Sequence, residues 1–389
     1  MSEKRKDNKG RILRSGESQR KDLTYQYRYT DPFGRRETVY SPDLKGLREK
    51  ELEIEKMALK GGDYAAGNIT VEELVQRYLG FKKGVRYNTK VGYKFVSNLI
   101  SKQVFAKKKI RDVKVSDAQL WLLKLQNQDG YGHSSICTVR GVLKPAFQLA
   151  VNDDVLPKNP FDFPLVGLIK NDSSTHPVLS VEQEKEWMDF IKNSSTYSKY
   201  YDEFVVLLNT GLRVSEFCGL TKTDLDFENR RIRVDHQLLR ERNGTYFIEY
   251  PKTKAGSRFV PMNDATYQSL QNILKNRPKL EEEMTIDGYT GFILIDSRRH
   301  PKVALHLINE LRWAQARYNT LYPGNSMPKI SPHVFRHTFC TRMATSGMDV
   351  KTLQYIMGHS DIGVTMNVYT HCDYDQAAKQ MAKIYSYSE

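Results

Sequence analysis

The stretch from Ser331 to His371, SPHVFRHTFCTRMATSGMDVKTLQYIMGHSDIGVTMNVYTH, constrains this chain more than any other part of it. Ser331 followed by Pro332 predicts the start of a helix, because serine caps the first turn and proline suits the first helical position. A second helix is expected from Val350 to Met357. Gly358 then allows the left-handed turn that commonly ends a helix. The stretch therefore predicts two helices followed by a loop.

Two histidines, an arginine and a tyrosine stand in this stretch at spacings that suit phosphoryl transfer. His333 and Arg336 are three residues apart, so they share a face of the first helix. His359 follows the glycine turn, and Tyr369 lies ten residues further on. Each of these residues alone is most often a solvated or structural side chain. Together they indicate a catalytic site for an anion.

The charge of the chain favours a polyanionic partner. Its 389 residues contain 60 Lys and Arg against 46 Asp and Glu, a formal net charge of +14. The length predicts two or three domains. The sequence contains no long apolar run, signal peptide or lipidation motif, so nucleic acid is a better interpretation of the charge than a membrane surface.

The four cysteines are far apart and include no Cys-x-x-Cys pair, which argues against a zinc site and against a disulfide framework. A reducing cytoplasm is the expected location. Cys137, Cys218 and Cys340 stand in apolar helical contexts and are expected to fill the core.

The first 66 residues predict a small DNA-binding module. After a polar basic arm, tyrosines alternate with Gln26 and Arg28, and a turn leads to a second strand around Glu37 to Tyr40. A helix opened by Ser41 and Pro42 follows. Residues 1–40 hold eleven Lys and Arg against six Asp and Glu, so we expect a basic aromatic face that includes Arg28 to contact DNA. The alternative is that Tyr25, Tyr27 and Tyr29 cap a small core.

Residues 69 to about 165 are expected to be helical and to bind DNA. Thr70 with Glu73, and Ser116 with Gln119, have the spacing of capping boxes. Residues 80–114 hold eleven Lys and Arg and a single acid, which favours phosphate contacts over a role in solubility alone. The residues expected to contact DNA are Lys82, Lys83, Arg86, Lys90, Lys94, Lys107, Lys108 and Lys109.

The part after a Pro- and Asn-rich linker predicts helices around a small sheet. The apolar segment YYDEFVVLLNTG predicts a buried helix that stops at Gly211, so Arg213 emerges where this helix breaks. One antiparallel sheet is expected from strands near residues 232–234, 246–249 and 258–260, with Lys252 and Lys254 in its turn. A further strand is expected at GFILID, residues 291–296.

Three motifs resemble those of the tyrosine recombinases, also called the phage integrase family. HVFRH followed by GHSDIGVTMNVYTH resembles the second active-site block of the family, TGLRVSE resembles the first, and YPKTKAGSRFVPM resembles the hairpin that carries an active lysine. The interval from His359 to Tyr369 is one residue longer than in many members. The N-terminal module resembles the arm-site-binding domain of the integrases of conjugative transposons, and the basic helical part resembles a core-binding domain.

The resemblance implies a multidomain protein, mainly α with small β-sheets. The expected domains are a small N-terminal β-sheet plus helix module (1–66), a helical core-binding domain (67–165), a linker (166–176) and a mixed α/β tyrosine-recombinase catalytic domain with a C-terminal tail (177–389).

The resemblance also implies the catalytic roles. Tyr369 is expected to be the nucleophile that forms a 3′-phosphotyrosine, and Arg213 and Arg336 are expected to grip the phosphate. His333 and His359 donate hydrogen bonds or shuttle a proton. A lysine protonates the leaving 5′-hydroxyl. Lys252 is the first choice and Lys254 the competitor, while Glu216 is expected to orient Arg213. No metal, cofactor or ATP is expected.

We therefore expect a site-specific recombinase that integrates and excises a mobile element. Its expected partners are double-stranded DNA at crossover and arm sites, further copies of the chain in a homotetramer on paired sites, and an excisionase or a host DNA-bending protein. The alternatives are a chromosome-dimer or plasmid resolvase, a non-catalytic DNA-binding regulator and a topoisomerase. An apolar stripe in the tail, Ala377, Ala378, Met381, Ile384 and Tyr385, is expected to dock on its own catalytic domain or on a neighbouring copy.

Overall fold

The computed structural model describes residues 5–30, 34–58, 66–172 and 178–366, together with residues 368, 378 and 381. The chain divides into two compact units, Met1–Ser174 and Thr175–Glu389. Tyr369 lies outside the described residues, as do the turn at 31–33 and most of the tail. The expected fold class, mainly α with small sheets, is confirmed.

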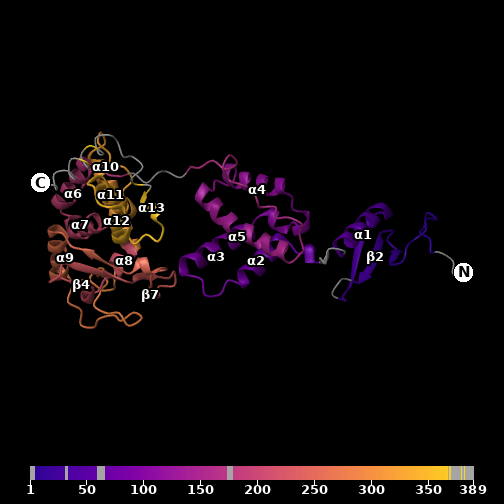
Figure 1. Ribbon diagram of the computed structural model, residues 1–389, viewed down its shortest axis with the longest axis horizontal. Helices are drawn as coiled ribbons and strands as arrows, with labels where there is room; N and C mark the ends of the chain where they lie inside the picture. Colours follow the sequence, from indigo (N-terminus) through magenta and orange to yellow (C-terminus); the bar gives the residue numbers. More distant parts are fainter. Residues whose placement is uncertain are drawn as a thin grey trace. The chain divides into compact units, whose positions relative to one another are not determined.

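The N-terminal module is a three-stranded antiparallel sheet with one helix packed on it (Figure 1). Leu47 of the helix is fully buried and packs with Tyr25 and Val39 of the sheet. The elements are β1 (Glu17–Gln19), β2 (Tyr25–Thr30), β3 (Arg36–Ser41) and α1 (Leu44–Ala58).

Two features of this module go beyond the elements that the sequence predicts. The basic arm contains strand β1, whose Glu17 is fully buried against Arg48 of α1. Tyr25 faces the core, and Tyr27 and Tyr29 pack against it, as in the alternative in which the tyrosines cap a small core. Their spacing of two residues explains this, because alternate residues of a strand share one face. Arg28 lies on the other face and is exposed.

Four helices form the second part of the first unit, with two short 3-10 turns between the second and the third of them. Thr70 caps the first helix as predicted, with Glu73 completing the capping box. The predicted cap at Ser116 is wrong, because the third of these helices already starts at Val115, and Asp117 accepts the backbone N–H of Lys114 at 2.9 Å. The helices are α2 (Val71–Gly80), α3 (Tyr87–Ile100), α4 (Val115–Asn127) and α5 (His133–Asn152).

The start of the expected linker belongs to this helical part. Ile169 is buried in the same core as Phe161 and Phe163. Asp172 accepts the backbone N–H of His133 at the first turn of α5, at 2.8 Å. Residues 166–172 therefore pack on the bundle, because apolar side chains between the prolines anchor them. Cys137, expected in the core, is exposed on α5, whereas Cys218 and Cys340 are buried as predicted.

The second unit packs helices around two small sheets (Figure 1). Its core contains the fully buried aromatic side chains of Trp187, Phe204, Phe217, Phe292 and Phe335. The helices are α6 (Val181–Asn193), α7 (Tyr201–Thr210), α8 (Val214–Gly219), α9 (Asp264–Asn276), α10 (Ala304–Leu321), α11 (Pro332–Thr345), α12 (Val350–Met357) and α13 (Ile362–Met366). The strands are β4 (Leu225–Asp226), β5 (Arg231–Val234), β6 (Gln237–Arg240), β7 (Tyr246–Glu249) and β8 (Arg258–Pro261).

The strand pairing differs from the single predicted sheet. Strands β4, β5 and β8 form one sheet, while β6 and β7 form a separate hairpin. Both edges of β5 are occupied, by β4 and β8, so β7 pairs with the new strand β6. The predicted strand at 291–296 makes only isolated bridges, at Phe292 and Ile295, although Phe292, Ile293 and Leu294 are all buried.

Within the part of the chain that the structure describes, none of the helices combines the length and the apolar character needed to cross a membrane.

Candidate active site

Arg213 stands at a rigid break between two buried helices. Helix α7 ends at Gly211, whose φ of 63° is left-handed. A side chain at this position would come within 2.5 Å of the Phe339 ring, so the turn requires glycine for space as well as for conformation. Arg213 then caps α8, and its guanidinium donates to Glu216 at 2.7 Å and to the Gly358 carbonyl at 3.1 Å. The contact expected between Glu216 and Arg213 is therefore present.

Arg336 lies one turn into α11 and is 7% exposed. The helix starts at the predicted cap, where the Ser331 hydroxyl accepts the backbone N–H of Val334. The Arg336 guanidinium donates to the carbonyls of Gly211 and Met357. Burial, and then the positive charge of Arg213, lower the pKa of Arg336 from its ordinary value. Glu216 acts in the opposite direction, so the charge of this guanidinium is only partly compensated.

His359 follows the left-handed Gly358, as the sequence predicts. Its Nε2 lies 3.0 Å from Nη2 of Arg336, and its Nδ1 lies 3.0 Å from the Thr365 hydroxyl. An arginine only donates, so Nε2 accepts and Nδ1 carries the proton. Burial, and then the charges of Arg336 and Arg213, lower the pKa of His359 to about 4. Geometry and charge therefore agree on a neutral imidazole.

Arg258 is part of this cluster, although it was not among the predicted catalytic residues. Its fully buried side chain donates to both carboxylate oxygens of Glu216, at 2.9 and 3.2 Å. Burial alone would raise the pKa of Glu216, but the hydrogen bonds and charge of Arg258, with Arg213 and Arg336 nearby, lower that pKa to about 2. The signal was the alternation of β8, which puts Arg258 on the same inward face as Val260.

The end of α12 gathers the three arginines. The carbonyls of Ile356, Met357 and Gly358 are consecutive, and each accepts a hydrogen bond from a different guanidinium, those of Arg258, Arg336 and Arg213 respectively. The last carbonyls of a helix have no partner within it and form the negative end of the helix dipole. They hold the three guanidiniums together, but Glu216 is the only carboxylate that these hydrogen bonds bring to them. Positive charge is therefore in excess, and the arrangement suits a bound anion.

The other predicted catalytic residues that the structure describes are exposed at the surface. His333 lies on α11, one turn before Arg336, with an exposed side chain. Lys252 and Lys254 are both exposed in the loop between β7 and β8. Arg258 donates to the Gly256 carbonyl of that loop at 3.1 Å, so the lysine loop is tied to the cluster through its backbone. Tyr369 is outside the described residues.

The residues predicted to contact DNA in the helical part fall into two groups. Lys107 and Lys108 form ion pairs with Glu72 and Asp117, at 2.8 and 2.7 Å. Such surface pairs are worth about 1 kcal/mol or less, so a phosphate can compete for them. The remaining lysines are exposed on or near α2 and α3, and one of them sits over an aromatic ring. They are Lys82 above Tyr78, Lys83, Lys90 and Lys94, with Lys109 and the half-buried Arg86 nearby.

Among the described residues, one group brings together ligands of the kind that bind metals: Asp224, Asp235 and His236. Its donor atoms already have protein partners. Asp224 accepts two hydrogen bonds from Arg233, while the ring nitrogens of His236 contact Asp235 at 2.6 Å and the Gly219 carbonyl at 2.8 Å. The group is a closed hydrogen-bond network that ties α8 to the base of the β6–β7 hairpin.

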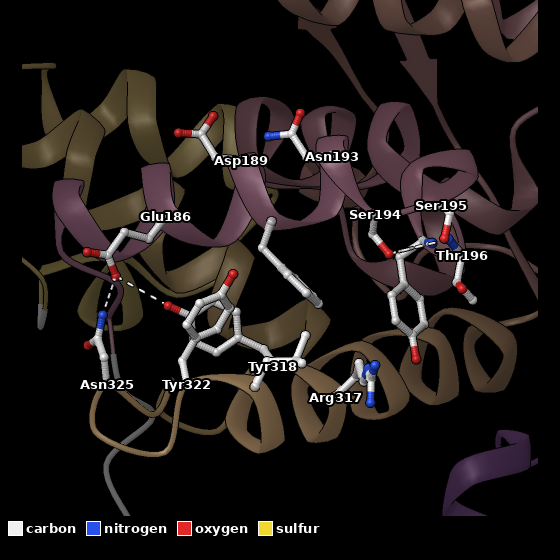
Figure 2. Close-up of a pocket in the computed structure, with 13 residues that line it drawn as sticks. Glu186, Asp189, Asn193, Ser194, Ser195, Thr196, Arg317, Tyr318, Tyr322 and Asn325 are labelled. Carbon is white, nitrogen blue, oxygen red and sulfur yellow. Dashed lines mark hydrogen bonds between the residues drawn. The ribbon is translucent and has the colours of Figure 1, made fainter.

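A groove with a cavity volume of about 740 Å³ lies between α6 and α10. Figure 2 shows Glu186 of α6 linked across it to Asn325 and Tyr318, with hydrogen bonds of 2.9 and 3.4 Å. Phe190 and Tyr322 add aromatic surface to its wall. Because no residue of the arginine cluster lines this groove, it is separate from the candidate active site.

Comparison with known proteins agrees with this geometry. Residues 177–376 match the phage integrase family, and residues 1–58 match the DNA-binding domain of the Tn916 integrase. The transposase from transposon Tn916 of Enterococcus faecalis and the transposase from transposon Tn1545 of Streptococcus pneumoniae are each 42% identical over 397 residues, which span 99% of this chain and 97% of each relative.

Solved structures show the same relationship. The Tn1549 transposon integrase in complex with a circular intermediate DNA is similar with a TM-score of 0.77 and 39% identity, covering 81% of this chain and 99% of that one. A lambda integrase dimer bound to a core site shares the fold, with a TM-score of 0.56 and 15% identity over 92% of this chain and 95% of that one. The resemblance stated from the motifs is thus confirmed, and the chain belongs to the phage integrase family as a tyrosine-type site-specific DNA recombinase.

Proposed function

We propose that the arginine cluster binds the scissile phosphodiester of DNA and that Tyr369 attacks its phosphorus. The observation that carries this assignment is the excess of positive charge, since Arg213, Arg258 and Arg336 share the single carboxylate of Glu216. A phosphodiester brings one negative charge and two non-bridging oxygens, which the planar forks of Arg213 and Arg336 match. Attack adds charge to these oxygens, so preorganised donors stabilise the transition state most.

The proposed reaction balances without a cofactor. The phenolic oxygen of Tyr369 bonds to phosphorus and passes its proton to His359, while the bond from phosphorus to the 5′-oxygen breaks. That oxygen takes a proton, from Lys252 as the first candidate or from Lys254 as the second. Both lysines are exposed beside the backbone that Arg258 holds. The 3′-phosphotyrosine keeps a phosphate ester of similar energy, so rejoining needs neither ATP nor a metal.

The two histidines have different proposed roles. Nε2 of His359 accepts from Arg336 in this arrangement, and burial with the nearby guanidiniums lowers the pKa of His359. His359 can therefore take up a proton once a bound phosphate offsets this positive charge, and its ring must exchange tautomers before it donates to phosphate. His333 is exposed on the same helix as Arg336 and is proposed to donate to the phosphate.

The proposed biological role is the integration and excision of a mobile element. Residues 1–58 match a domain named for DNA binding, and the relatives are transposon proteins, which favours this role over that of a resolvase. We propose an N-terminal arm-site module (1–66), a core-binding domain that extends to residue 172, and a catalytic domain (177–389). Arg28 and the exposed lysines of the helical part are the proposed DNA contacts.

The proposed assembly is a homotetramer on paired DNA sites in the cytoplasm, with an excisionase or a host DNA-bending protein as an additional partner. The tail carries an apolar stripe, with Lys379 and Lys383 mostly off it. The groove between α6 and α10 combines aromatic side chains with Glu186 and Asp189, a character that such a stripe would match on its own domain or on a neighbour.

The direct test uses a nicked duplex that spans the recombination site beside the coding region, incubated with protein in excess EDTA. Wild type should form a denaturant-resistant adduct, and Tyr369→Phe should bind the duplex without forming one, because only the attacking oxygen is lost. Tyr374→Phe, five residues further on, is the matched control and should react like wild type. An adduct formed by Tyr369→Phe, or one that requires Mg²⁺, would overturn the proposal.

A further inference from the structure

Arg258 makes more contacts within the site than a structural salt bridge needs. Its guanidinium donates to both oxygens of Glu216, to the Ile356 carbonyl at 2.6 Å and to the Gly256 carbonyl at 3.1 Å. The side chain is fully buried. One guanidinium therefore joins the start of α8, the end of α12 and the loop that carries the lysines.

Gly358 marks how closely these segments approach one another. A side chain at this position would come within 2.8 Å of the Arg258 guanidinium and 3.2 Å of the Ala255 carbonyl in the lysine loop. The turn that presents His359 is thus packed directly against both Arg258 and the loop. A displacement of Arg258 is transmitted to each of them, because the contacts leave no space to absorb it.

We propose that Arg258 is a positioning residue for strand cleavage, which holds Glu216 so that Arg213 is aimed at the phosphate and which keeps the lysine loop in register with the end of α12. Arg258 acts through these groups and does not itself touch the DNA. Glu216 uses its second contact, the 2.7 Å hydrogen bond from Nη1 of Arg213, to fix the direction of that side chain. The inference rests on the proposed function, since it concerns the same cleavage step.

The consequence of removing Arg258 follows from what remains around Glu216. The guanidiniums that face its carboxylate come from α8 (Arg213), β8 (Arg258) and α11 (Arg336). In Arg258→Met the carboxylate keeps its burial but loses its strongest partner, so its pKa rises from about 2. Once Glu216 is protonated, it no longer accepts a charge-assisted hydrogen bond from Arg213, and the orientation of the Arg213 side chain is no longer fixed.

The experiment measures single-turnover adduct formation on saturating nicked duplex, duplex affinity and thermal unfolding, from pH 5 to pH 8. Arg258→Met should bind DNA near normally and cleave about 100-fold more slowly, the loss typical of a misplacement of about 1 Å. Arg277→Met is the matched control, because the Arg277 side chain is only 5% exposed and pairs with Glu283 and the Phe292 carbonyl. It should cleave at the wild-type rate once folded.

Two readouts separate positioning from a purely structural role. Cleavage by Arg258→Met should decline further towards pH 5, beyond any change in wild type, as Glu216 takes up a proton. Adding Glu216→Gln to Arg258→Met should abolish this extra pH dependence and slow cleavage little further. Both substitutions disrupt the same chain of contacts from Arg258 through Glu216 to Arg213, so their effects should not add. Arg258→Lys keeps the charge but not the four bonds, so it should be intermediate, and it replaces Arg258→Met in the comparison if that variant does not fold.

A wild-type cleavage rate in Arg258→Met would overturn the inference. So would a loss that is equal at every pH and additive with Glu216→Gln, because both would show that Arg258 only supports the fold. Absence of an adduct with the wild-type chain would instead overturn the proposed function, so the two failures are distinguishable.

Discussion

Within the described part of the second unit, the arginine cluster can be compared with a buried charge cluster of opposite composition. In one, three arginines share Glu216 and the carbonyls at the end of α12. In the other, Lys302 donates to both oxygens of Glu203, at 2.7 and 2.9 Å, and to Glu310 at 3.0 Å, with all three residues under 10% exposed. One cluster has positive charge in excess and the other has negative charge in excess.

The excess charge of each cluster can be neutralised in a different way. Burial raises the pKa of Glu203 to about 7, so the second cluster can neutralise itself by taking up a proton. A guanidinium has no equivalent, because arginine stays protonated in proteins. Among the described residues, Glu216 is the carboxylate that these arginines share, so an anion from outside would relieve the remaining charge. The comparison leads to the hypothesis that the sign of the excess charge, and whether protonation can remove it, distinguishes the proposed substrate site from a structural ion cluster.

The largest expected effect comes from breaking the arginine side of the comparison. Arg336→Met removes a donor aimed at the developing charge, so adduct formation should fall by about 10²- to 10³-fold. Lys302→Met should leave the rate per folded molecule unchanged, because that cluster faces no substrate. Single-turnover kinetics on the nicked duplex measure both. Equal losses in the two variants would erase the distinction between the clusters.

The loss of folding stability should be larger for Lys302→Met than for Arg336→Met, the reverse of the order expected for the cleavage rate. Lys302→Met leaves two carboxylates buried without their cation and should destabilise the catalytic domain by about 3–5 kcal/mol. Arg336→Met should cost less, because it removes one of three mutually repelling charges. Calorimetric unfolding of the full chain gives both values. A larger loss for Arg336→Met would mean that its charge is already compensated within the protein.

The smallest expected effect is a loss of folding stability at acid pH, which arises from two groups of the arginine cluster. The folded-state pKa of His359, about 4, lies below its ordinary 6.5, so between these values the unfolded chain binds a proton that the folded chain does not. The depressed pKa of Glu216, about 2 against 4.5, acts below pH 4.5 in the same direction. Both contributions reduce stability as pH falls.

His359→Gln should therefore lessen the loss of stability between pH 6.5 and 5, while the loss below pH 4.5 persists. Thermal unfolding at stepped pH measures this difference. If the variant were as sensitive as wild type between pH 6.5 and 5, another group would be titrating there.

Local signals in the sequence predicted the elements that carry the site. The helix start at Ser331 and Pro332, the helix Val350–Met357 and the glycine turns at 211 and 358 are all present. Each depends on a few neighbouring residues, through a side-chain cap or a left-handed glycine. The Thr70 cap depends on the same kind of local signal. The cap predicted at Ser116 is absent, because the helix starts at Val115 and Asp117 accepts the backbone N–H of Lys114.

These local signals could not predict which distant residues meet in the site. The meeting of Arg258 with Glu216 joins residues 42 positions apart. The contacts of Arg258 with Ile356 and of Arg213 with Gly358 join residues 98 and 145 positions apart. Strand alternation placed Arg258 on an inward face, but it did not identify the partner. The pairing of β7 with β6 was missed for a related reason, since it depends on which edges β5 has free.

The central claim is that the arginine cluster neutralises the charge of the scissile phosphate. A duplex with a methylphosphonate at that position tests it most directly, because a neutral methyl group replaces one charged oxygen. Cleavage of the ordinary phosphodiester should be far slower in Arg213→Ala than in wild type, and the difference should largely disappear on the methylphosphonate. An equally large loss on both substrates would contradict the account, because Arg213 would then be needed for something other than charge.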